Sequence, residues 1–185
     1  MAKTVLSRFV NTDYIVDRKP ESEGAEVLKG GKQKHGRVIV YTDGGCDPNP
    51  GVGGWAAVLL YKDRRKELSG AEPCSTNNRM ELTAAIEALR ALKRPCAVEM
   101  HTDSEYLRKG ITVWLPNWKR RGWKRNTGSL KNADLWKELD DLAQRHDIQW
   151  QWVEGHAGIP ENERCDILAR NAIFKLKQAS VPGTK

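Results

Sequence analysis

Four carboxylates stand at places in the sequence where a folded chain could bring them together. Asp43, Glu81, Asp103 and Asp166 are side chains of the type that bind hard cations or carry protons. Like charges at close range are unfavourable, and proteins resolve such clusters with shared protons or bound cations. The candidate ligands are all oxygens and no Cys or His pair lies nearby in sequence. A hard cation such as Mg²⁺ or Mn²⁺ is therefore a better match than zinc.

His156 is the one histidine whose position could serve the same chemistry. It lies in a loop, 154–160, where glycines flank it on both sides. An isolated loop histidine is more often a surface residue than a functional one. Beside a cluster of carboxylates it would be a candidate proton carrier, because the unperturbed pKa of histidine lies near physiological pH. Both interpretations remain open at this point.

The acids need secondary-structure elements that aim them at one place. Residues 37–42 form an apolar run rich in β-branched side chains, which predicts a buried strand that delivers Asp43 at its carboxyl end. Ligands of open α/β sheets bind at that end of the strands. The alternative is that Asp43 merely opens the turn 43–51, since Asp, Gly, Asn and Pro are ordinary turn formers.

The rest of the chain predicts alternating elements of both kinds. Further strands are expected at 55–61, 66–71, 98–103 and 148–153. Helices are expected from Asn78 with caps among Thr76, Asn77 and Asn78, from Ser104, over 132–145 and over 161–177. Residues 111–131 show no clear period, and we expect them to be irregular and basic.

This order predicts one α/β domain with a five-stranded mixed sheet flanked by helices. Short connections make the first three strands an antiparallel meander, and right-handed crossovers make the later strands parallel to the first. Asp43 and Asp103 then emerge at the same sheet edge, with Glu81 and Asp166 at the margins of the helix faces that pack on the sheet. Taken singly, each acid could instead be a helix cap or a solvated side chain.

Positive charge points to a polyanionic partner. The formal net charge is +7, and the cations cluster between residues 118 and 132, where no acid occurs and tryptophans interleave. A run of charge is usually a solvated face. Aromatic side chains among cations of one sign suit a groove that grips a nucleic-acid backbone. The candidate side chains are Trp114, Trp118, Lys119, Arg120, Arg121, Trp123, Lys124, Arg125 and Lys131.

The remaining features bound the location and organisation of the protein. Four separated cysteines without a C-x-x-C pair are expected to be reduced thiols, and no apolar stretch is long enough for a membrane span. We expect a cytoplasmic monomer with no membrane association; a basic start without acids leaves organelle targeting as a weaker alternative. Residues 1–36 are expected to be a flexible N-terminal extension, 37–177 the folded domain and 178–185 a flexible tail.

The ordered motifs of the chain resemble those of bacterial type 1 ribonucleases H. The similarity extends over about residues 37–177. The matching segments are 41–46 (YTDGGC), 49–51 (NPG), 76–82 (TNNRMEL), 102–104 (TDS), 117–123 (NWKRRGW), 155–158 (GHAG) and 162–166 (NERCD). Any one of these segments would be weak evidence, whereas the ordered set is specific.

The resemblance implies a ribonuclease H-like fold and endonucleolytic cleavage of the RNA strand in RNA/DNA hybrids, with 5′-phosphate and 3′-hydroxyl products. It implies that Asp43, Glu81, Asp103 and Asp166 hold two Mg²⁺ ions, with Mn²⁺ able to substitute, and that His156 assists proton transfer or product departure. It also implies that Cys46, Asn49, Asn77 and Asn78 line the minor groove, that Thr76 lies near a DNA phosphate, and that the basic segment grips the DNA strand.

One residue departs from the family pattern at the expected site. Glu105 stands where well-known bacterial members have an amide, and an acid there would repel phosphate or change ion affinity. Two other functions stay open: a module that binds hybrids without cutting them, and a polynucleotidyl transferase of the integrase kind. Loss of a metal ligand would mark the first, and the second usually lacks the basic segment and the Asn77-Asn78 motif.

Overall fold

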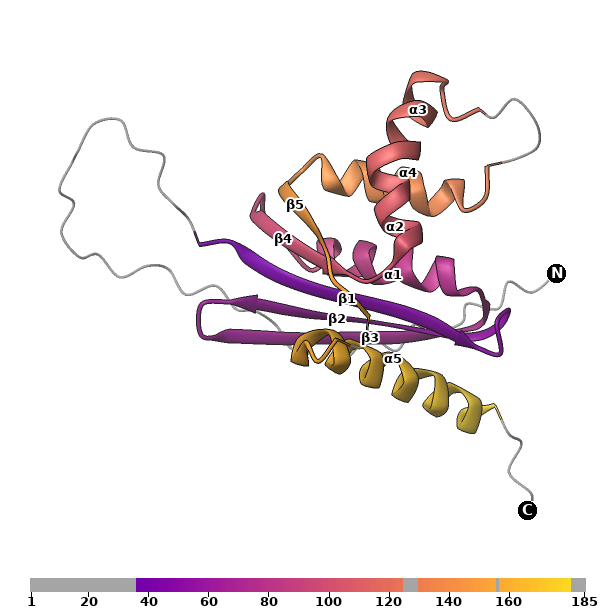
Figure 1. The fold of residues 1–185 in the computed structure, drawn as a ribbon. Coiled ribbons are helices and arrows are strands. Elements are labelled where there is room, and N and C mark those ends of the chain that lie inside the picture. Colours follow the sequence, from indigo (N-terminus) through magenta and orange to yellow (C-terminus); the bar gives the residue numbers. More distant parts are fainter. Residues whose placement is uncertain (1–35, 125–129, 156, 181–185) are drawn as a thin grey trace, which may run out of the picture.

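The computed structural model describes residues 36–124, 130–155 and 157–180. Its centre is a five-stranded sheet with the order β3-β2-β1-β4-β5 (Figure 1). The strands are β1 (Val38–Asp47), β2 (Gly51–Tyr61), β3 (Arg64–Ser75), β4 (Ala97–Thr102) and β5 (Asp147–Trp152). β1 is antiparallel to β2 and parallel to β4, and β4 is parallel to β5. The predicted mixed sheet is confirmed.

Helices cover both faces of the sheet. α1 (Asn77–Arg90) packs on β1 and β2 from one side and is itself covered by α4 (Ala133–Ala143), whereas α5 (Pro160–Ala179) packs on β1, β2 and β3 from the other (Figure 1). α2 (Glu105–Lys109), the π-helix η1 (Gly110–Trp114) and α3 (Leu115–Arg120) follow one another and project from the body. None of the helices in the described part of the chain is both long and apolar enough to cross a membrane.

Alternation along β1 explains how the strand serves two layers. Val38, Val40 and Thr42 are buried on the side of α1, while Tyr41 packs with the smaller cluster that Cys165 and its neighbours form under α5. A strand buried on both faces reads as a continuous apolar run, which is why residues 37–42 were recognisable as a strand. Asp43 falls on the α5 side of this alternation.

The expectation that the first strand ends at Asp43 is wrong. β1 does not end at Asp43 but continues to Asp47, because Asp43 pairs with Ala56 and the antiparallel ladder with β2 continues to Val52. Only the parallel ladder with β4 stops, at the pair Thr42 and Thr102. The turn that was expected over residues 43–51 covers only residues 48–50.

The segment expected to be irregular is largely helical as far as it is described. Residues 110–120 form η1 and α3, and the rings of Trp114 and Trp118 lie 5.8 Å apart, with Trp118 5.6 Å from Trp136 of α4. The aromatic contact with Trp136 stabilises η1 and α3. Packing against a distant element can stabilise a helix whose own sequence shows little helical periodicity. The last helix runs to Ala179, two residues beyond its expected end.

Candidate active site

Asp43 lies on β1 immediately beyond the last residue that pairs with β4. Its Oδ1 accepts a hydrogen bond of 2.7 Å from the backbone N–H of Gly44. The absence of a β4 partner at this point leaves the Asp43 side chain at the open edge between two parallel strands. This is the edge that the sequence predicted, although the strand itself continues.

Glu81 reaches this edge from α1. The helix begins at Asn77, with the Thr76 side chain capping the N–H of Arg79, so Glu81 lies just after the first turn. Gly44 lets α1 come close: a Cβ at Gly44 would stand 2.6 Å from the Glu81 backbone nitrogen. The missing side chain therefore places the start of α1, and with it Glu81, beside Asp43.

The electrostatics of Glu81 show that three of the acids share one region. Burial raises the pKa of Glu81 to about 7, with the charges of Asp43 and Asp103 adding to the rise and a hydrogen bond from Ser104 opposing it. A carboxylate surrounded in this way is a strong attractor for a proton or a cation. Convergence of Asp43, Glu81 and Asp103 is thus a property of the fold.

Asp103 follows β4 directly and is held by neighbours on both sides. The Nδ2 of Asn162, a buried residue of α5, donates a 3.0 Å hydrogen bond to Asp103 Oδ2. Next in the chain, Ser104 caps α2 by accepting from the Leu107 N–H at 3.1 Å and donates to Glu81 Oε2. Ser104 therefore ties α2, Asp103 and Glu81 together.

Asp166 arrives from α5 and lines the same groove as Asp43. The groove runs between the end of β1 and α5 and also exposes Arg170 and Phe174. Asp166 forms an ion pair of 2.8 Å with Arg170, one helical turn further on. Burial, with a contribution from Asp43, raises the pKa of the adjacent Cys165 thiol, so this cysteine is a neutral packing residue between α5 and the sheet.

Each of the four acids thus has a partner within the protein. In this arrangement, no group of three or more Asp, Glu, His or Cys side chains among the described residues is close enough to form a metal-binding cluster. The donor set nevertheless fits a hard cation, because it offers carboxylate oxygens only. A cation would have to compete with Arg170 for Asp166 and with Ser104 for Glu81. His156 lies outside the described residues.

The residues expected to line the minor groove of a hybrid lie together at the rim. The backbone N–H of Cys46 donates to Asn77 Oδ1 at 2.8 Å, and the N–H of Asn77 donates to Asn49 Oδ1 at 3.2 Å. Thr76 caps α1 at the same place, and Asn78 is exposed beside it. The hydrogen bonds join the β1–β2 turn to the start of α1 and give this rim one defined shape.

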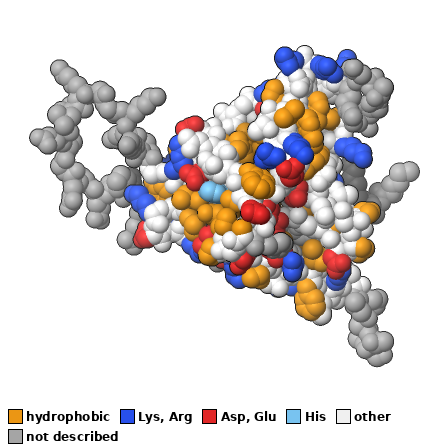
Figure 2. Space-filling view, viewed as in Figure 1, with side chains coloured by type: hydrophobic (Ala, Val, Ile, Leu, Met, Phe, Trp, Pro, Cys, Tyr) orange, Lys and Arg blue, Asp and Glu red, His pale blue; other side chains and the backbone are white. Residues whose placement is uncertain are grey.

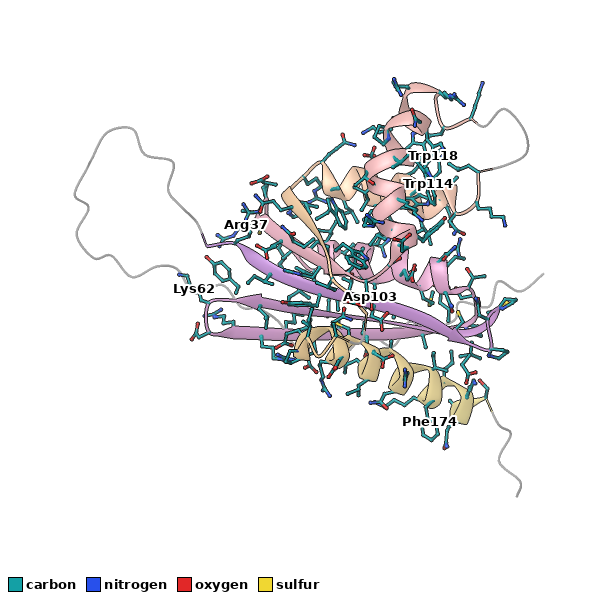
Figure 3. All side chains as sticks on the ribbon, in the orientation of Figure 1. Arg37, Lys62, Asp103, Trp114, Trp118 and Phe174 are labelled. Atoms are coloured by element: carbon teal, nitrogen blue, oxygen red, sulfur yellow. The ribbon has the colours of Figure 1, made fainter. Side chains whose placement is uncertain are left out.

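The basic segment divides into packed and exposed side chains. Trp114, Trp118 and Trp123 are half-buried. Trp114 ends η1 and Trp118 lies on α3, and both lie above Asp103 in Figure 3. Lys119 pairs with the buried Asp140 of α4 at 2.8 Å, so its charge is already compensated. Arg120, Arg121 and Lys124 are exposed on this projecting part, where Figure 2 shows blue side chains. A role in binding the DNA strand stays a prediction for all seven residues.

Glu105 is neutralised where it stands. Arg108 Nη2 lies 2.6 Å and Lys109 Nζ 2.5 Å from its carboxylate, and these bonds lower the pKa of Glu105. The Arg108 guanidinium lies 5.8 Å from the centre of the Trp152 ring. The anticipated repulsion of phosphate is therefore offset by two cations on the same helix.

Sequence reasoning assigned no role to four residues that shape this site. Ser104 was recognised only as a helix cap, and Asn162 only as part of a motif. Gly44 could have been found from the Asp-Gly-Gly signal after a buried strand, and Arg170 from its i,i+4 spacing to Asp166 on a predicted helix. Only the folded chain shows that Asn162 reaches Asp103.

The RNase H family model matches residues 35–174, which is most of the chain. The chain belongs to the RNase H family. The predicted resemblance, the fold and the class of enzyme are confirmed by this match.

Curated relatives agree with the family match. The chain is 62% identical over 137 residues to Ribonuclease H of Nitrosococcus oceani, covering 74% of this chain and 93% of that protein. It is 58% identical over 141 residues to Ribonuclease HI of Pseudomonas aeruginosa, covering 76% of this chain and 95% of the relative.

Solved structures show the same fold. LC9-RNase H1, described as a type 1 RNase H with the type 2 active-site motif, superposes with a TM-score of 0.71 at 34% identity, covering 78% of this chain and 75% of that one. LC11-RNase H1 in complex with an RNA/DNA hybrid superposes with a TM-score of 0.58 at 22% identity, covering 76% and 99%. The latter likeness concerns the fold alone.

Proposed function

We propose that the protein hydrolyses the RNA strand of RNA/DNA hybrids, leaving 5′-phosphate and 3′-hydroxyl ends. The observation that carries this proposal is the convergence of Asp43, Glu81 and Asp103 at one sheet edge, where burial and mutual repulsion raise the pKa of Glu81 to about 7. Metal dependence is general in the family to which the chain belongs. The family to which the chain belongs supports this substrate class, and so does the solved complex of LC11-RNase H1, which has a similar fold, with an RNA/DNA hybrid.

The four acids are the proposed ligands of two Mg²⁺ ions, with Mn²⁺ able to replace them. Such a pair of ions supplies a nucleophile from bound water and stabilises the leaving 3′-oxygen. Within the chain, Ser104 orients Glu81 and Asn162 orients Asp103, so two ligands from different elements are held in place. His156 is proposed to assist proton transfer or product departure.

The rim next to these acids is proposed to recognise the hybrid. Short polar side chains and backbone groups at Cys46, Asn49, Asn77 and Asn78 can contact base edges and 2′-hydroxyls in a shallow minor groove. Thr76 is proposed to lie near a DNA phosphate. The exposed cations of the basic segment would hold the DNA strand through its backbone.

Cleavage of end-labelled RNA tests the proposal directly. RNA is offered as an RNA/DNA hybrid, as an RNA duplex and as a single strand, each with Mg²⁺ and with EDTA. We expect cutting of the hybrid alone, and only with Mg²⁺. Cleavage in EDTA, or equal cleavage of all three forms, would contradict it.

Asp43→Asn separates catalysis from binding. This change removes one proposed ligand while keeping the shape of the side chain, so cleavage should fall by at least a thousandfold and hybrid binding should persist. Asp47→Asn is the matched control, because Asp47 lies on the same strand but pairs with Lys177 at 2.6 Å. A fully active Asp43→Asn protein would refute the proposal that Asp43 is a metal ligand. Hybrid binding without cleavage by the unaltered protein would favour the binding-module alternative.

A further inference from the structure

Four charged side chains join β3 to the start of α5. Arg65 Nη1 donates to Glu161 Oε1 at 2.7 Å and Arg65 Nε donates to Glu67 Oε1 at 3.0 Å. From α5, Arg164 donates to both oxygens of Glu67, at 3.0 and 2.8 Å. The bidentate contact fixes orientation as well as distance, because the planar guanidinium matches the carboxylate in only a few geometries.

This network lies where α5 lacks a cap of its own. The residue at the N-cap position is Ile159, whose side chain makes no capping hydrogen bond, and Pro160 follows it. Glu161 lies in the first turn of the helix and Arg164 follows directly after it. Figure 1 shows this end of α5 beneath the sheet, on the side where α5 packs against β3. The ion pairs with β3 therefore hold the start of α5 in place, where no capping side chain does so.

Asn162 lies within the anchored turn. It is only 5% exposed, and its Nδ2 donates to Asp103 at 3.0 Å. Its Oδ1 is buried without a hydrogen-bond partner among the described residues. The amide therefore has one polar contact that sets its direction, and a small shift of the turn would move it away from Asp103.

We propose that Arg65, Glu67, Glu161 and Arg164 are positioning residues that act on the active site through Asn162 and Asp103. The inference rests on the proposed function, since it assigns Asp103 a catalytic role. It makes β3, the strand at the sheet edge far from β4, part of the machinery that orients a ligand carboxylate.

The charges of the network suit this role at neutral pH. The hydrogen bonds from Arg164 lower the pKa of Glu67, and the hydrogen bond to Glu161 raises the pKa of Arg65, so both groups are ionised. The side chains are between 23% and 42% exposed. Ion pairs at such exposure contribute little to global stability. Their loss should be seen in turnover before it is seen in melting temperature.

Glu67→Gln is the main test, because it removes the charge that both arginines share and keeps the shape. We expect kcat on the hybrid to fall about tenfold, with KM within twofold and the melting temperature within a few degrees of the unaltered protein. Arg164→Gln removes the partner of Glu67 on α5 and should give the same result. Glu163→Gln is the control, since Glu163 lies on the same turn, is exposed, and makes no ion pair with any described residue.

A double variant tests the route through Asn162. If the network acts through this residue, Glu67→Gln added to Asn162→Ala should lower kcat no further than Asn162→Ala alone. If the losses of kcat in Glu67→Gln and Asn162→Ala multiplied in the double variant, the network would act by another route, and the proposal would be overturned. An effect of Glu163→Gln equal to that of Glu67→Gln would do the same.

A measurement without turnover separates this inference from the proposed function. The side-chain amide of Asn162 can be followed in ¹H–¹⁵N spectra of the full chain, and its signal should shift in Glu67→Gln and not in Glu163→Gln. An unchanged signal in Glu67→Gln would refute the positioning role. Failure of the unaltered protein to cut hybrids would instead count against the proposed function.

Discussion

Gly44 of β1 lies directly against the backbone of Met80 in α1. A Cβ on Gly44 would stand 2.3 Å from the Met80 carbonyl carbon and 2.5 Å from its oxygen, distances that real Cβ atoms do not show. The close approach sets the depth at which α1 sits on the sheet and so the distance from Glu81 to Asp43. One missing side chain thus links the packing of the core to the geometry of the site.

Gly44→Ala should therefore damage stability and activity together. We expect the free energy of unfolding to fall by about 1–3 kcal/mol, as for other overpacked positions, and hybrid cleavage to fall with it because Glu81 is displaced. Urea unfolding and the cleavage assay measure the two effects. Gly45→Ala is the control on the same strand, since a Cβ there meets nothing within 4 Å. Equal behaviour of the two variants would show that the contact does not matter.

The raised pKa of Glu81 predicts how stability depends on pH in the metal-free protein. A carboxyl whose pKa rises on folding, here from 4.5 to about 7, favours the folded state while it is protonated. Its contribution is full below pH 4.5 and is lost as the pH rises to about 7, with a loss on the order of 3 kcal/mol in the free energy of unfolding.

Glu81→Gln provides the comparison for this pH effect. The variant lacks the titrating group, so urea unfolding in EDTA should show a smaller loss of stability between pH 4.5 and 7 than in the unaltered protein. Added Mg²⁺ should reduce the difference by favouring the ionised carboxylate. Parallel stability curves for the two proteins in EDTA would show that Glu81 is not the group responsible.

The basic segment should give different results for two neighbouring cations. Lys119 is paired with the buried Asp140, whereas the Arg120 side chain is exposed and bonds only to Asn117 among the described residues. Arg120→Ala should lower the salt slope of hybrid binding by about one, the loss of one phosphate contact. Lys119→Ala should change the slope less and instead lower the free energy of unfolding by about 1–3 kcal/mol, because Asp140 loses its cation.

Two measurements distinguish the effect of Arg120→Ala from that of Lys119→Ala: hybrid binding over a range of salt concentrations, and thermal unfolding. If Lys119→Ala changed the salt slope as much as Arg120→Ala and left stability intact, Lys119 would be a phosphate contact despite its pairing with Asp140.

Arg170 should compete with a metal ion for Asp166. The two side chains form a 2.8 Å ion pair, so a divalent cation must displace the guanidinium before it binds Asp166. Arg170→Ala should therefore tighten Mg²⁺ binding several-fold in calorimetry on the substrate-free protein. Lys175→Ala is the control, being exposed on the same helix with no ion pair in the described part of the chain. Weaker Mg²⁺ binding in Arg170→Ala would contradict the competition.

The sheet and the edge at which the acids lie could be predicted from local patterns in the sequence. A continuous apolar run marked β1, alternation marked β4, and the crossover rule made the two strands parallel, which brings Asp43 and Asp103 to one edge. These signals are local periodicities. They are strong because a shift of one residue in strand register would turn the apolar side chains to the opposite face of the sheet. They are strong enough to be read without a structure.

The side chains around those acids come from elements that are distant in the sequence. Asn162 reaches Asp103 across 59 positions of sequence, and Arg164 reaches Glu67 across 97. The helical course of residues 110–120 likewise depends on Trp136 of α4. Side-chain contacts between distant elements leave no periodic trace along the chain, because each depends on how whole elements pack. The sequence therefore placed the carboxylates, and the packing of α1 and α5 on the sheet set their partners, their charge state and their orientation.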